Sequence, residues 1–84
     1  MTTVVKSLVE MDTGESGLVT DVRGGGGFRR RLDAMGIRLG VRLTKTSGHY
    51  LRGPVTVRTG NSEIALGFGM AGRVLLTCGK EGPA

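Results

Sequence analysis

Apolar and polar residues alternate along much of the chain, a pattern that predicts short β-strands. The segments expected to form strands are residues 4–9, 18–22, 41–46, 55–59, 62–66 and 73–78. The third to fifth segments alternate with a period of two, so each is expected to bury one face. The first segment fits either a strand or a turn, and Gly60 and Asn61 join the fourth and fifth segments as a hairpin.

One stretch has the spacing of a helix instead. Phe28, Leu32 and Met35 stand at positions i, i+4 and i+7, so they share one helical face. Gly36 follows where a helix end favours a left-handed residue, and Ile37 is the apolar residue that packs back on the last turn. We therefore expect a helix of about two turns over residues 28–35 that stops at Gly36. The residues expected to plug the end of the fold are Phe28, Leu32, Met35 and Ile37.

The length and composition favour one small all-β domain. The chain has 84 residues, and only two Phe and one Tyr, so its core is expected to be aliphatic. Five or six strands in so short a chain must protect their edges, and closing into a small barrel does so. The 16 glycines fit bent strands and tight corners. We expect a single domain over residues 1–78, followed by a flexible tail over residues 79–84.

Positive charge is concentrated after the first quarter of the chain. The net charge is +5, and from Arg23 onward eleven bases stand against three acids. Such a surface suits nucleic acid, an anionic membrane face or an acidic protein partner. Arg29, Arg30 and Arg31 are adjacent on the predicted helix, where they form either a solvated face or a basic docking edge. The first residues lack a signal peptide pattern and no apolar run is long enough to span a membrane, so a cytoplasmic location without membrane insertion is expected.

Candidate chemistry is sparse. Glycines 24–27 precede the helix, but no Gly-Lys-Ser/Thr follows, so a phosphate-binding loop is not expected. His49 and Cys78 are the plausible metal ligands, yet no two candidates have ligand spacing. No nucleophile, base and orienting group stand together in a recognisable set. We therefore predict no catalytic residue, no cofactor and no metal site.

Four segments together resemble a known family. Gly-Glu-Ser-Gly at residues 14–17 precedes a strand, and Phe-Arg-Arg-Arg-Leu-Asp-Ala-Met-Gly-Ile-Arg-Leu-Gly-Val follows at residues 28–41. Ile-Ala-Leu at residues 64–66 and Ala-Gly-Arg-Val-Leu at residues 71–75 come later. This order is similar to that of the FeoA family of bacterial ferrous iron transport. Phe28 stands where leucine is commoner, and residues 67–70 depart from the family pattern.

The resemblance implies an SH3-like barrel and a role as a non-catalytic accessory that binds the cytosolic face of the FeoB transporter. On this interpretation the partner-binding residues are Arg29, Arg30, Arg31 and Arg38. Two alternatives stay open: a nucleic-acid-binding barrel, although stacking aromatics are few, and a direct ferrous-iron or transition-metal-binding regulator. We do not expect nucleic acid as a partner, and weak homo-oligomerisation is also left open.

Overall fold

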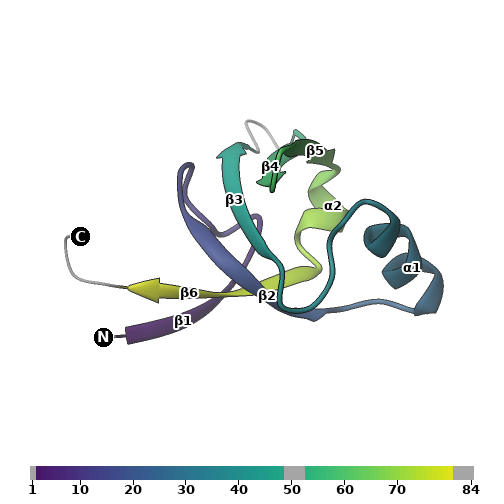
Figure 1. Cartoon of the computed structure of the whole chain (residues 1–84), viewed down its shortest axis with the longest axis horizontal. Helices are drawn as coiled ribbons and strands as arrows, with labels where there is room; N and C mark the ends of the chain where they lie inside the picture. The colour runs from purple at the N-terminus through teal and green to yellow at the C-terminus, as the bar shows by residue number, and fades with distance from the viewer. Residues whose placement is uncertain (1, 49–52, 81–84) are drawn as a thin grey trace.

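Over the residues that the structure describes, the fold is one antiparallel sheet of six strands with two short helices (Figure 1). The computed structural model describes residues 2–48 and 53–80. In chain order the elements are β1 (Thr2–Ser7), β2 (Ser16–Val22), α1 (Gly26–Ala34), β3 (Arg42–Ser47), β4 (Val55–Thr59), β5 (Ser62–Leu66), α2 (Phe68–Ala71) and β6 (Val74–Lys80). The strand order is β1-β6-β2-β3-β4-β5, so the last strand of the chain lies between the first two.

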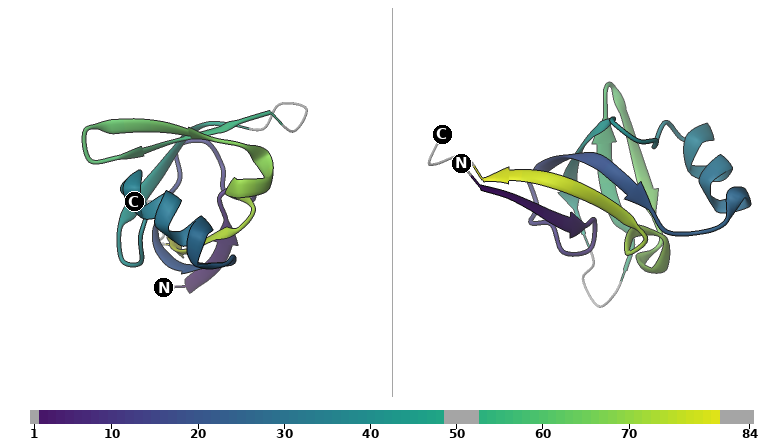
Figure 2. Two further views of the ribbon diagram at one scale, coloured as in Figure 1. Left: turned by 90° about the vertical axis from the view of Figure 1, so that its right-hand side faces the viewer. Right: turned by 90° about the horizontal axis from the view of Figure 1, so that it is seen from below.

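The sheet curls around a small aliphatic core (Figure 2). Register shifts between Val19 and Asp21 of β2, and between Lys45 and Ser47 of β3, mark bulges, which bend and twist a strand locally. The core residues come from every strand except β1, and from both helices and the loops. The fully or nearly buried apolar residues are Leu8, Met11, Val19, Val22, Leu32, Ile37, Leu43, Val55, Val57, Leu66, Ala71, Val74, Leu76 and Cys78.

The prediction of an all-β fold with a short helix is confirmed, with differences at the element ends. The helix was expected over residues 28–35, whereas α1 begins at Gly26 and Met35 caps it. The first turn includes two glycines because the Arg29 N–H already bonds the Gly25 carbonyl, at 3.0 Å. The tail was expected from residue 79, but β6 continues to Lys80 because its end pairs with Thr2 and Thr3 of β1.

The helix α1 and the strand pair β1–β6 lie at opposite ends of an elongated molecule. The principal extents are 38 × 27 × 23 Å, and α1 lies at one end of the long axis while β1 and β6 project at the other (Figure 1). Within the described ranges, no helix has the length and apolar character needed to cross a membrane. The two ends of the molecule therefore present separate surfaces.

Candidate functional site

The helix α1 is held to the core at its C-terminal end. The Ile37 N–H donates to the Leu32 carbonyl and the Gly36 N–H to the Asp33 carbonyl, both at 2.9 Å. This pair of bonds, with Gly36 at φ +88°, is a Schellman motif. Leu32 and Ile37 are both buried in the core, while Phe28 and Met35 are partly buried and pack against it. The helix end thus fixes where the following loop leaves the barrel.

Arg29 supports the glycine segment before α1. One of its terminal nitrogens donates to the Val22 carbonyl at 2.7 Å, and its Nε donates to the Gly24 carbonyl at 3.4 Å. The same guanidinium lies 3.7 Å from an oxygen of Asp21. The sequence left open a solvated face or a docking edge for Arg29, and the structure shows that its side chain also holds the chain between β2 and α1.

Arg38 lies on the loop after α1 and pairs back to the helix. Its Nε donates to Asp33 Oδ1 at 2.5 Å, and both side chains are mostly exposed. The pair holds the guanidinium in one place at the surface without burying it. An exposed pair of this kind adds little stability, and what the structure shows is the guanidinium of Arg38 beside Asp33 of α1.

A shallow open pocket of about 180 Å³ lies between α1, the end of β2 and the loop after α1. Its lining residues are Val22, Arg29, Asp33, Ile37, Arg38 and Leu39. Leu39 is 58% exposed, so a large apolar side chain of the pocket lining stays in contact with solvent. Apolar surface flanked by arginine is common at the centre of protein interfaces. We call this set of six residues the helix pocket.

Two of the four predicted partner-binding arginines therefore meet in one place. Arg29 and Arg38 line the helix pocket, whereas Arg30 and Arg31 are exposed on α1 and do not. The guanidinium of Arg30 lies over Gly26, where a Cβ would stand 3.3 Å from its nitrogen. Leu39 was missed because a single leucine between Arg38 and Gly40 carries no periodic signal. Its exposure becomes visible only once the loop is placed.

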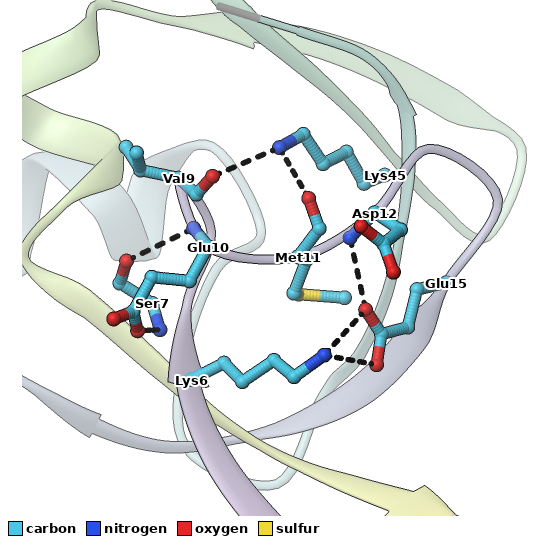
Figure 3. Close-up of polar contacts among 8 residues, drawn as sticks. All are labelled: Lys6, Ser7, Val9, Glu10, Met11, Asp12, Glu15 and Lys45. Carbon is cyan, nitrogen blue, oxygen red and sulfur yellow. Dashed lines mark hydrogen bonds and ion pairs between the residues drawn. The ribbon is translucent and has the colours of Figure 1, made fainter.

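A second group of polar contacts lies in the loop after β1, away from the helix pocket (Figure 3). Lys45 of β3 is 1% exposed, and its ammonium donates to the carbonyls of Val9 and Met11 at 3.2 and 2.6 Å. Burial lowers the pKa of Lys45 below its usual 10.5, and the nearby charges of Asp12 and Glu15 oppose this in part. The side chain thus ties the strand β3 to the loop through the interior.

The same loop is tied at its surface by carboxylates (Figure 3). Lys6 donates to both oxygens of Glu15, at 3.1 and 3.0 Å, and the Asp12 N–H donates to Glu15 at 2.9 Å. The Ser7 N–H donates to Glu10 at 2.8 Å, and the Glu10 N–H returns a bond to the Ser7 hydroxyl at 3.3 Å. These contacts fix the conformation of the loop between β1 and β2.

Acid is expected to weaken the fold through Glu15. The bond from Asp12, followed by Lys6, holds the pKa of Glu15 below its usual 4.5. The unfolded chain binds this proton at a higher pH than the folded chain, so the stabilisation is present above about pH 5 and is lost as the pH falls through the folded pKa. Urea midpoints measured between about pH 6 and pH 3 should fall in the native protein and fall less in Glu15→Gln. An unchanged slope in Glu15→Gln would contradict the assignment.

The structure describes one of the two metal candidates, Cys78. His49 lies outside the described residues. Cys78 is buried in the core, and burial is the main cause that raises the pKa of its thiol above the usual 9.0. Among residues 2–48 and 53–80, no three His, Cys, Asp or Glu side chains stand close enough to hold an ion.

The chain is similar to proteins of known structure over most of its length. A sequence profile of the FeoA domain matches residues 6–78. The crystal structure of an iron uptake regulatory protein, FeoA, matches with a TM-score of 0.83 and 33% identity, over 89% of this chain and 99% of that one. The zinc complex of Stenotrophomonas maltophilia FeoA, described as a procaryotic SH3 domain protein, matches with a TM-score of 0.67 and 26% identity, over 83% of this chain and 87% of that one. The expected SH3-like fold is thereby confirmed.

The same fold also occurs within longer proteins. A manganese-dependent transcriptional repressor matches with a TM-score of 0.82 at 20% identity. The match covers 93% of this chain but 44% of the repressor, and at this identity it shows the fold alone. No curated protein sequence matched the chain.

Proposed function

The chain belongs to the FeoA family, as the match over residues 6–78 shows, and from this we propose that it is a cytosolic accessory protein of ferrous iron uptake. It acts as a non-catalytic module that binds the cytosolic face of a FeoB-type transporter. The observation that carries the proposal is the helix pocket, whose lining combines the exposed Leu39 with Arg29 and Arg38. The iron uptake regulatory protein at 33% identity supports the assignment to iron transport.

The helix pocket fits an apolar side chain that has carboxylates beside it. Leu39 and the apolar floor of Val22 and Ile37 take the apolar group, while the guanidinium of Arg38 is already oriented by Asp33. A carboxylate of the partner shares or replaces Asp33 on that guanidinium. The net charge of +5 speeds the encounter with an acidic face and makes it sensitive to salt.

Binding to the purified cytosolic part of a FeoB-type transporter tests the proposal. Leu39→Ser is expected to weaken binding by about 10- to 100-fold, because burying a leucine contributes about 1.5 to 3 kcal/mol. Arg38→Gln should weaken it by a smaller factor and reduce its dependence on salt. The matched control is Arg58→Gln, since Arg58 is also mostly exposed and ion-paired, with Glu63 at 3.6 Å, but lies outside the helix pocket.

Calorimetry or biolayer interferometry gives the affinities, and circular dichroism checks that each variant is folded. Equal binding by the native chain and Leu39→Ser would show that the helix pocket is not the docking site. No binding at low salt would remove the transporter as partner. Duplex DNA and RNA serve as competing ligands, and a steep loss of nucleic-acid affinity with rising salt would support the nucleic-acid alternative instead.

A further inference from the structure

The strand β1 forms one free edge of the sheet. The strand order places β1 and β5 at the two ends, and an edge strand offers unpaired backbone groups to any strand that can reach it. β1 pairs with β6 in unbroken register from Thr2 to Ser7, so no bulge turns this edge away. It is therefore a six-residue strand without a bulge, open on one side.

The direction of each backbone group on β1 follows from the ladder. The Leu8 N–H donates to the Val74 carbonyl at 3.1 Å, which continues the β1–β6 pairing by one residue. Backbone groups alternate in direction along an antiparallel strand, so even-numbered residues bond to β6. Thr3, Val5 and Ser7 consequently direct their N–H and C=O groups outward.

Only two of these three residues are left open. The Ser7 N–H donates a hydrogen bond to the Glu10 carboxylate. The Ser7 carbonyl accepts hydrogen bonds from the N–H groups of Glu10 and Met11 at 3.0 and 3.2 Å. Within the part of the chain that the structure describes, no comparable bond satisfies the outward groups of Thr3 or Val5. The free edge thus carries two donors and two acceptors in a defined place.

This edge also lacks the usual protection against pairing. Its one charged residue, Lys6, has its ammonium 3.0 Å from Glu15, and no proline interrupts it. Val4 and Val5 are 40% and 58% exposed. On the opposite edge, Glu63 of β5 is also ion-paired, with Arg58 at 3.6 Å, but its side chain is 52% exposed, whereas that of Lys6 is 26% exposed, so Glu63 is the more available charge to guard an edge.

We propose that β1 pairs antiparallel with β1 of a second copy of this chain. One register uses every open group: Thr3 pairs with Val5 of the second copy and Val5 with its Thr3, which forms four hydrogen bonds. Val4 then lies on the two-fold axis, facing Val4 of the second copy. Lys6 falls opposite Thr2 of the second copy, so no like charges oppose each other across the ladder.

Two features of the molecule favour a second copy as the partner at this edge. The open groups are complementary to themselves under two-fold symmetry, as an isologous interface requires. The helix α1 lies at the far end of the long axis (Figure 1), so pairing leaves the helix pocket of each copy free. The proposal is thus independent of what the helix pocket binds.

Sedimentation or light scattering at protein concentrations from about 10 µM to 1 mM tests the pairing. The range is high because pairing through two open residues buries less surface than a stable interface needs, so the dimer is expected to be weak. The mass should rise from 8.8 kDa toward twice that value. Val4→Lys and Val4→Glu should each stay monomeric, while an equimolar mixture should recover the dimer. Val5→Lys carries the same charge but faces Thr3 of the second copy, so it should weaken the dimer less than Val4→Lys.

Mild oxidation of Val4→Cys provides a direct test of register. Residues facing each other between hydrogen-bonded pairs have Cα atoms about 4.5 Å apart, within disulfide range, and the native Cys78 is buried and should not compete. A cross-linked dimer is expected. A native chain that stays monomeric throughout the range, a dimer unaffected by Val4→Lys, or absence of the cross-link would each overturn the proposal.

Discussion

Replacing Lys45 by alanine is expected to destabilise the protein by about 3 to 5 kcal/mol. The substitution removes most of a fully buried side chain and leaves the carbonyls of Val9 and Met11 without their shared donor. A domain of 84 residues has a total stability of about 4 to 12 kcal/mol, so much of it should be lost. Urea unfolding followed by circular dichroism measures the change.

Two further variants separate the causes of that loss. Lys45→Met keeps the volume and removes both the buried charge and the donor, so it should cost less than Lys45→Ala. Arg42→Ala changes an exposed residue of the same strand and should stay within about 0.5 kcal/mol of the native chain. A Lys45→Ala protein as stable as native would mean that water reaches the two carbonyls and replaces the ammonium.

Truncation of Leu32 to alanine should cost about 2 to 5 kcal/mol and loosen α1 selectively. Leu32 is the one buried residue of this helix, and its carbonyl accepts the bonds from Met35 and Ile37 that end it. Loss of its packing should raise amide hydrogen exchange over α1 more than over β2 or β6. The helix pocket should lose its shape with the helix, because Arg29 and Asp33 belong to both.

Arg31→Ala is the matched control for Leu32→Ala. Arg31 is exposed on the same helix, and alanine favours helices at least as well as arginine, so exchange over α1 should stay close to native. If Leu32→Ala exchanged uniformly faster in every strand, the helix would be a part of the cooperative core rather than a separable cover.

The strands were predictable where local pattern and turn chemistry agree. β4 and β5 begin and end as expected, because alternation and the turn at Gly60 and Asn61 define them within one hairpin. The end of β6 was not predictable in the same way. Gly79 and Lys80 extend the strand only because β1, more than 70 positions away in the sequence, supplies the pairing edge.

The candidate site was predictable in kind but not in detail. Arginines near α1 were expected, and two of them line the helix pocket, but the pocket depends on where the loop after Gly36 places Leu39. The buried Lys45 was also missed, although it shares the inward face of β3 with Leu43. A lysine on an alternating strand is usually solvated, and only the carbonyls of a distant loop make its burial favourable.

The position of β6 between β1 and β2 has a consequence for synthesis. The first two strands emerge early from the ribosome but have no direct pairing with each other in the sheet. They must wait for residues 74–80, at the other end of the chain, before either can complete its ladder. Sheets dominated by such distant contacts fold slowly, so the nascent chain should remain sensitive to proteases until its last strand has left the exit tunnel.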